Sequence, residues 1–150
     1  MVIGMELTEE QIEKIADELQ TGMKVYVNIE TTEIKSIIDF DSYIDAEEES
    51  WEEDIKEIEK NYDKYLEFEK MDSSESYRVM EDFTEMVEDE ELRKRLELGL
   101  SLSKPFRNFK DIIDYEDENR KKWFAYKNAR YIEYVKELLE MYNNRIDDEE

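Results

Sequence analysis

The sequence predicts an α+β fold in which a small antiparallel sheet is packed by about five or six helices. Two apolar runs, residues 24–29 and 34–38, alternate with the period of two that is typical of strands. Elsewhere the apolar residues recur every three or four positions, as on the buried face of a helix. The order is helix, strands and then helices, with no repeat and no evident linker, which predicts a single domain over residues 1–142.

The first helix is predicted by the signals at its two ends. Thr8 and Gln11 have the spacing of a capping box, and Gly22 supplies a stop. The turn at residues 30–33 contains no Gly or Asn that would adopt a positive φ cheaply. We therefore expect a longer loop between the two strands rather than a tight two-residue turn. The apolar positions of the first helix are Ile12, Ile15, Ala16 and Leu19.

The next elements follow an acidic connection over residues 39–49. Alternation over residues 65–69 is brief and could add a third strand to the hairpin. Asp72 and Glu75 indicate a helix cap, and the helical pattern continues over residues 90–102. A helix before the third strand is indicated by Trp51, Ile55, Ile58 and Tyr62. The capped helix has an apolar face made of Tyr77, Met80, Phe83 and Val87.

The second half of the chain reads as helical. Pro105, the only proline, fits the first turn of a short helix that carries Phe106 and Phe109. Residues 120–142 predict one long helix. Residues 143–150 are expected to be a frayed acidic tail. The apolar stripe of the long helix is made of Tyr131, Val135, Leu138, Leu139 and Tyr142.

Composition excludes several classes of chemistry. The chain has 44 Asp and Glu against 21 Lys and Arg, a net charge of −23, which argues against direct nucleic-acid binding. It has no Cys, so disulfides, zinc-thiolate sites and thiol nucleophiles are excluded. It has no His, which removes the usual general base near neutral pH. Its 18 aromatic residues, each able to bury roughly 150–250 Å², favour a folded domain over disorder.

The expected compartment is the cytoplasm. The first ten residues lack the positive region and the apolar region of a signal peptide. No apolar run approaches the roughly 18 residues of a transmembrane helix, so we expect no association with a membrane.

Three segments of the second half resemble the bacterial uncharacterised protein family 0158. They are ESYRVMEDF at 75–83, KPFRNFK at 104–110 and RKKWFAY at 120–126, and the resemblance extends over residues 23–142. The lysine-proline-phenylalanine-arginine segment is its most specific part. Where the family has Thr-Gly-Glu in the hairpin turn, this chain has Thr31-Thr32-Glu33. The resemblance implies a shared fold and carries over no catalytic residues.

Two acidic patterns have some of the spacing of a calcium site. One is a would-be calcium loop, but Tyr43 takes a ligand position, Ile44 replaces the required Gly, and Ser50 stands where a bidentate Glu is needed. Residues 114–119 fail in a similar way, so we expect solvated acidic loops and no metal or other cofactor. The acids of the first pattern are Asp39, Asp41, Asp45 and Glu47.

A third pattern concerns metal-dependent nucleases, whose sites combine acidic metal ligands with a lysine. Glu33-Ile34-Lys35 matches the Glu-x-Lys half of such a site. The partner Asp expected on a neighbouring strand is missing, because Asp17 lies on a predicted helix. The exposed face of an amphipathic strand explains the three residues better.

Charge is distributed unevenly along the chain. Residues 1–60 hold 5 basic and 19 acidic side chains, a net of −14, whereas residues 101–150 hold 10 and 12, a net of −2. In the second segment cations alternate with aromatics. We expect most of these aromatics to be core and most of the cations to pair internally with the acidic first half of the chain. The remaining interpretation is a surface that contacts an acidic protein partner. Its candidate residues are Lys104, Arg107, Lys110 and Arg120.

Three functions follow from these patterns. The first is a small acidic, non-catalytic module that binds an unidentified protein partner. The second is an acidic mask, in which carboxylates imitate phosphates and occupy a basic nucleic-acid-binding protein. The third is a carboxylate-based metal-dependent hydrolase.

Overall fold

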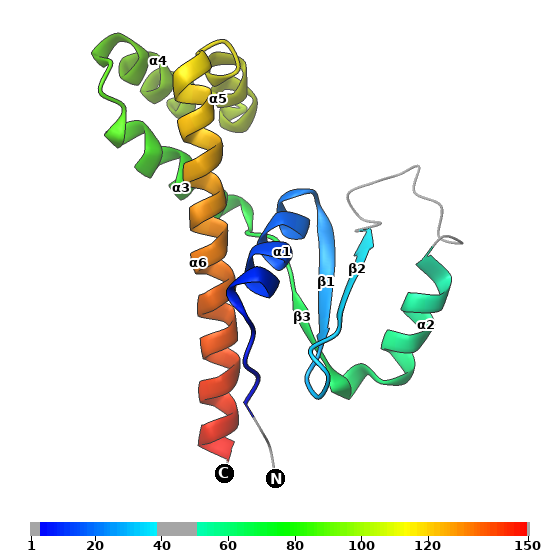
Figure 1. Cartoon of the computed structure of the whole chain (residues 1–150). Helices are drawn as coiled ribbons and strands as arrows, with labels where there is room; N and C mark the ends of the chain where they lie inside the picture. The colour runs from blue at the N-terminus through cyan, green and yellow to red at the C-terminus, as the bar shows by residue number, and fades with distance from the viewer. Residues whose placement is uncertain (1–3, 39–50, 150) are drawn as a thin grey trace. The chain divides into compact units, whose positions relative to one another are not determined.

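The computed structural model describes residues 4–38 and 51–149, with side chains as far as residue 146. This part of the chain forms six α-helices and one antiparallel sheet of three strands (Figure 1). The strands lie in the first half of the chain, and helices fill the second half. The predicted α+β fold with a helical C-terminal half is confirmed.

The chain divides into two compact units. The sheet unit consists of Met1–Lys70 together with Tyr131–Glu150, and the helical unit consists of Met71–Arg130. The expectation that residues 1–142 form one domain stays a prediction.

In the sheet unit, helix α1 (Glu9–Gln20) begins at the predicted capping box. The backbone N–H of Gln11 donates to the hydroxyl of Thr8 (3.1 Å), and the backbone N–H of Thr8 donates to the side-chain carbonyl of Gln11 (2.9 Å). Gly22, just after the helix, has a φ of 87°, which glycine adopts without a steric cost. All four predicted apolar positions of this helix are buried.

Strand β1 (Met23–Asn28) is the centre of the sheet. It pairs antiparallel with β2 (Ile34–Ile38) on one side and with β3 (Tyr65–Phe68) on the other. The predicted hairpin and the third strand are both confirmed.

One face of the sheet is packed by α1. Val25 and Val27 of β1 are fully buried on this face, as is Phe68, which stands opposite Val25 on β3. On the other face the hydroxyl of Tyr26 donates to the carboxylate of Glu67 on β3 (3.1 Å). Burial and the neighbouring carboxylate raise the pKa of Tyr26 above its ordinary value, which keeps the phenol protonated.

The loop of residues 29–33 joins β1 to β2, so the expected longer loop is confirmed. The side-chain carbonyl of Asn28 accepts from the backbone N–H groups of Glu30 (2.8 Å) and Thr31 (3.0 Å). Thr32 has a φ of 62°. Thr32, a β-branched residue, therefore adopts the left-handed conformation at the position where the turn of the family has a glycine.

Helix α2 (Glu52–Lys60) is shorter than predicted. Including Tyr62 in its apolar stripe is wrong, because Tyr62 is 70% exposed and lies in the 3₁₀ turn η2 (Tyr62–Lys64). The backbone N–H of Lys64 donates to the carbonyl of Asn61 (2.8 Å) in this turn, which leads the chain from the helix into β3. Ile58 is the buried residue of α2.

Helix α6 (Asp117–Glu149) confirms the predicted long helix and extends it at both ends. Its residues from Tyr131 onward belong to the sheet unit. Leu138 and Tyr142, two members of the predicted stripe, are only half-buried. The buried residues of this part are Tyr131, Val135, Leu139 and Ile146.

The helix continues where a frayed tail was expected to begin, at Asn143. The side-chain carbonyl of Asn143 accepts from the backbone N–H of Met5 (2.8 Å), and its amide donates to the carbonyl of Met5 (3.0 Å). Ile146, one turn further on, is 4% exposed. The contact between Asn143 and Met5 satisfies polar groups that the local sequence leaves without partners.

The helical unit is formed by α3 (Ser73–Met86), α4 (Glu90–Ser101), α5 (Pro105–Ile113) and the first part of α6. Asp72 caps α3 as predicted, by accepting from the backbone N–H three residues on (2.8 Å). Asp89 caps α4 in the same manner (3.2 Å), a cap that the sequence reading did not single out. Residues 87–89 therefore separate α3 from α4.

An aromatic cluster occupies the core of the helical unit. The ring of Phe109 on α5 lies 4.7 Å from that of Trp123 on α6, and the ring of Phe83 on α3 lies 5.3 Å from the same Trp123, centroid to centroid. Both pairs are edge-to-face, and all three side chains are buried. Such pairs stabilise by about 0.5–1.5 kcal/mol beyond the area that they bury.

The hairpin loop makes a first prediction. A non-glycine residue in the left-handed region strains the folded state by roughly 1–2 kcal/mol. A glycine at the same position removes this strain but lowers stability by about 0.4–1 kcal/mol, because it gives the unfolded chain more conformational entropy. The side-chain amide of Gln11 also donates to the hydroxyl of Thr32 (3.3 Å), and losing this hydrogen bond costs about 0.5–1.5 kcal/mol. The relief of strain and these two losses nearly cancel, so Thr32→Gly should leave the free energy of unfolding within about 0.5 kcal/mol of the wild type in urea titration.

Thr31→Gly is the matched control for that substitution. Thr31 has no positive φ, and its hydroxyl accepts from the backbone N–H of Glu33 (3.2 Å). This control should lose about 1 kcal/mol. Equal losses in the two variants would contradict the strain assigned to Thr32.

The contact between Asn143 and Met5 makes a second prediction. Asn143→Ala leaves two backbone groups of Met5 without their partner, so the free energy of unfolding should fall by about 1–3 kcal/mol. Asn144→Ala, at an exposed neighbouring position, should change it by less than about 0.5 kcal/mol. A loss that is the same for both variants would show that the amide of Asn143 does not anchor the helix.

Candidate partner-binding surface

The structure places the four predicted binding residues on or beside α5. Lys104 is the residue just before α5, Arg107 and Lys110 lie on it, and Arg120 lies near the start of α6. All four side chains are exposed.

Asp114, which follows α5, brings two of these cations together. Its Oδ2 lies 3.8 Å from Nζ of Lys110, and its Oδ1 lies 3.6 Å from Nε of Arg120. Ion pairs with this exposure contribute about 0–1 kcal/mol, so both cations keep most of their capacity to contact a partner. Asp114 was part of the second would-be calcium loop, and here it faces cations of the chain itself.

The other two cations, Lys104 and Arg107, have no acidic partner in the described part of the chain. Among the described residues, Lys104 and Arg107 make no ion pair and no side-chain hydrogen bond. The expectation that most cations of this stretch pair internally holds for Lys110, for Arg120 and for Arg130, whose Nη1 lies 2.8 Å from Asp82. It does not hold for the cations that make no ion pair among the described residues: Lys104, Arg107, Lys121, Lys122 and Lys127. The partners found, Asp114 and Asp82, lie outside the acidic first half, so the expectation is wrong for most of these cations.

The aromatics of this stretch divide into core and surface. Phe109 and Trp123 are buried as expected, but Phe106 is 43% exposed and Phe124 is 45% exposed, so the core expectation is wrong for these two. Phe106 occupies the first turn of α5, and Phe124 stands one residue beyond the buried Trp123. The guanidinium of Arg120 lies 4.9 Å from the centre of the Phe124 ring, in a cation–π contact.

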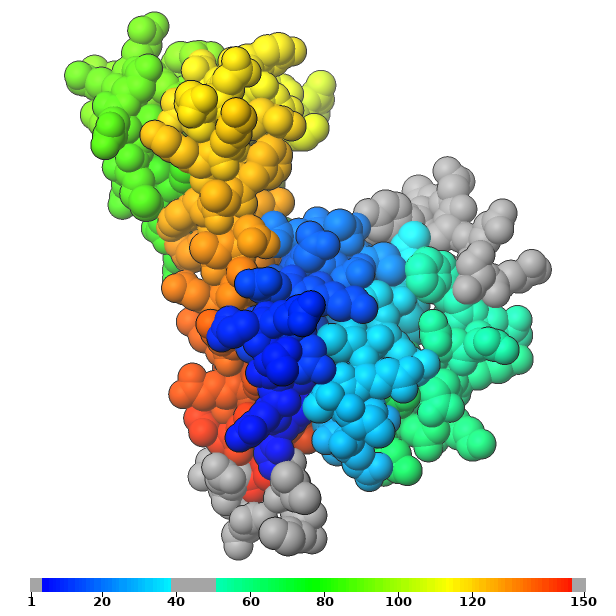
Figure 2. Space-filling view, in the orientation of Figure 1, coloured from blue at the N-terminus to red at the C-terminus, as the bar shows by residue number. Residues whose placement is uncertain are grey.

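We call these six residues the α5 surface: Lys104, Phe106, Arg107, Lys110, Arg120 and Phe124. Figure 2 shows side chains of α5 and of the beginning of α6, in yellow, at the surface of the helical unit.

The α4–α5 turn that presents this surface is tightly held. The side-chain amide of Asn108 donates to the carbonyls of Gly99 (2.9 Å) and Ser103 (2.8 Å). A Cβ on Gly99 would lie 3.2 Å from Ile112, so glycine lets α4 approach α5 closely. Lys104 has a φ of 59° at the end of the turn. Non-glycine residues in this conformation cost energy and persist where the surrounding structure holds them.

Two exposed leucines extend the apolar part of the turn. Leu98 is 61% exposed and Leu102 is 55% exposed, four residues apart at the end of α4. Their positions in the sequence indicate this exposure, because neither leucine has the helical spacing of the buried stripe of α4. That stripe consists of Leu92, Leu96 and Leu100.

Half-burial changes the chemistry of one further cation of the stretch. Burial lowers the pKa of Lys127 below its ordinary value, because the ammonium is partly withdrawn from water. Lys127 is therefore not counted as a free cation of the α5 surface.

The nuclease-like set is explained by ion pairing in the sheet unit. Nζ of Lys35 lies 3.1 Å from Oδ1 of Asp54 on α2 and 3.6 Å from Oε1 of Glu33. The hydrogen bond to Asp54 raises the pKa of Lys35. Lys35 therefore links β2 to α2, in keeping with its interpretation as part of an ordinary strand.

Metal-ligand groups were sought in the part of the chain that the structure describes. Within residues 4–38 and 51–146, no three acidic side chains converge in a way that could hold a metal ion. The would-be calcium loop with Asp39, Asp41, Asp45 and Glu47 lies outside the described residues.

The two units carry very different charges. The helical unit has 12 basic and 15 acidic residues, a net of −3. The sheet unit has 9 and 29, a net of −20. The α5 surface therefore belongs to the nearly neutral unit, where a partner meets the least repulsion between like charges.

The comparisons with known proteins agree with the sequence motifs. The model of an uncharacterised protein family, UPF0158, matches residues 34–149. The chain belongs to this family. The match covers the whole helical unit, including the α5 surface, and begins at β2. No curated protein and no solved structure matches the chain significantly.

Membrane-spanning segments were sought among the described helices as well. None of the helices in the described ranges combines the length and the apolar character that crossing a bilayer requires.

Proposed function

We propose that this chain is a cytoplasmic, non-catalytic module that binds a protein partner through the α5 surface. The observation that carries the proposal is the exposure of two rings, Phe106 on α5 and Phe124 on α6, in a stretch where Lys104 and Arg107 have no ion-pair partner among the described residues. Exposed aromatic and arginine side chains are typical of the centres of protein interfaces.

The chemistry of the α5 surface suggests the chemistry of its partner. The cations favour acidic side chains, and the exposed rings favour apolar side chains. Leu98 and Leu102, at the end of α4, add exposed apolar area to the same unit. The turn is held by Asn108, so the free surface is already ordered and little entropy is lost on binding. A partner that presents apolar residues bordered by carboxylates fits these features.

A second candidate function is supported by the charge of the sheet unit. A net charge of −20 on this unit would attract a basic nucleic-acid-binding protein, as an acidic mask does. Such binding weakens steeply as salt rises, whereas binding through an apolar centre does not. Salt dependence therefore separates the two candidates.

Affinity capture from a native lysate across a salt series tests the proposal. We expect the wild-type chain to retain a partner at 1 M salt, where the Debye length is about 3 Å. At about 0.15 M salt, where exposed charges are screened less, the double variant Arg107→Ala and Lys110→Ala should lose at least about nine-tenths of the wild-type retention, a change of roughly 1.4 kcal/mol in binding.

The control removes the same charge elsewhere in the helical unit. Lys94→Ala with Lys121→Ala, both exposed and outside the α5 surface, should leave retention unchanged. Equal retention by both double variants would place the binding site elsewhere. Retention only of basic proteins, and only at low salt, would replace the proposal with the acidic mask.

A further inference from the structure

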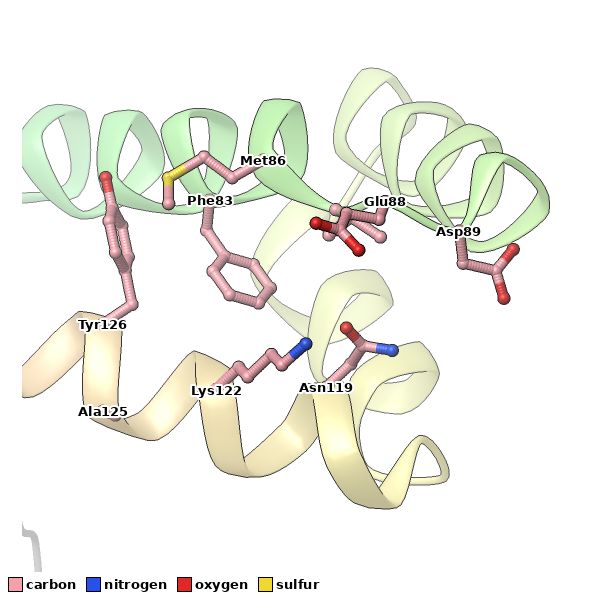
Figure 3. A pocket seen from close by; sticks show the side chains of 9 residues that line it. Phe83, Met86, Glu88, Asp89, Asn119, Lys122, Ala125 and Tyr126 are labelled. Atoms are coloured by element: carbon pink, nitrogen blue, oxygen red, sulfur yellow. The ribbon is translucent and has the colours of Figure 1, made fainter.

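The helical unit contains a pocket of about 480 Å³ that the proposed function does not use. It lies between the end of α3 and the start of α6, with Phe83, Val87 and Tyr126 among its apolar lining residues (Figure 3). This volume is within the range of small-molecule sites, roughly 300–1,000 Å³.

Polar side chains of both signs border the apolar part. Lys122 and Asn119 come from α6, and Glu88 comes from the turn between α3 and α4. Figure 3 shows the ammonium of Lys122 and the amide of Asn119 on the side of the pocket that faces the carboxylate of Glu88. Within the described residues, none of these three side chains makes an ion pair or a hydrogen bond.

The arrangement of charges restricts what the pocket can hold. An anion would meet the carboxylates of Glu88 and Asp89, and a cation would meet the ammonium of Lys122. A wholly apolar molecule would displace the water that solvates these charged groups and would form no hydrogen bond with them, which is unfavourable. A molecule with one cationic end, one anionic end and an apolar body satisfies both walls.

We propose that this pocket between α3 and α6 binds an apolar α-amino acid, with its ammonium at Glu88, its carboxylate at Lys122 and Asn119, and its side chain against Phe83 and Tyr126. The ring of Tyr126 is held in place for this role. Its hydroxyl accepts from Arg130 (2.7 Å), whose guanidinium also pairs with Asp82.

Titration of the full chain with L-phenylalanine, followed by amide chemical shifts, tests the proposal. We expect shifts centred on residues 83–89 and 119–126, with a dissociation constant of about 1 mM, as suits a small ligand in an open pocket. N-acetyl-phenylalanine and phenylalanine amide, each with one charge removed, should bind at least about tenfold more weakly. Those two analogues also imitate the two ends of a peptide, so tighter binding of either one would overturn the proposal in favour of a peptide end.

Two substitutions assign the charges. Lys122→Met and Glu88→Gln should each weaken binding of phenylalanine at least about tenfold. The matched controls Lys121→Met and Glu91→Gln, at exposed positions outside the pocket, should bind as the wild type does. All four lie at the surface, so far-ultraviolet circular dichroism should show an unchanged helix content.

The result that overturns the inference is the absence of shifts in the pocket at 10 mM phenylalanine. Equal binding by Lys122→Met and the wild type would overturn it as well. Neither result bears on the α5 surface, which the capture experiment tests separately.

Discussion

The edge-to-face packing of Phe83, Phe109 and Trp123 is the interaction on which the helical unit depends. It joins α3, α5 and α6, and it fixes the rotation of α6 about its axis. Each residue of a helix is turned by about 100° from the one before. Because Trp123 faces the core, Lys122 is directed to the pocket on one side and Phe124 to the solvent on the other. One buried ring thus positions both candidate sites.

Charge explains why so much depends on so few rings. Ten ion pairs are found among the described residues, and most are exposed, so each contributes about 0–1 kcal/mol. Against them stands the self-repulsion of a chain with a net charge of −23. Stabilisation must therefore come from burial, in the helical unit from the aromatic cluster and in the sheet unit from the apolar face between α1 and the strands. The excess of acid is concentrated in the sheet unit, which leaves the helical unit suited to contact other molecules.

Local signals predicted the elements well because caps and periodicity act within a few residues. The capping box at Thr8, the cap at Asp72 and the alternation around Val25 each encode a contact between near neighbours. Long-range contacts were not predictable in this way: Asn143 is held by Met5, 138 positions away. For the candidate site, the sequence identified the cations but not the exposure of Phe106. That ring lies three residues before the buried Phe109, a spacing that favours a shared face, and only the arrangement of the neighbouring helices leaves it half-exposed.

The measurement that tests this account most directly compares two phenylalanines of the same helix. Equilibrium unfolding in urea of Phe109→Ala should show a loss of roughly 3–5 kcal/mol, because the substitution opens a cavity in the aromatic cluster. Phe106→Ala, at a position that is 43% exposed, should lose less than about 1 kcal/mol. Similar losses at the two positions would contradict the division of this helix into one ring that holds the core and one that is free for a partner.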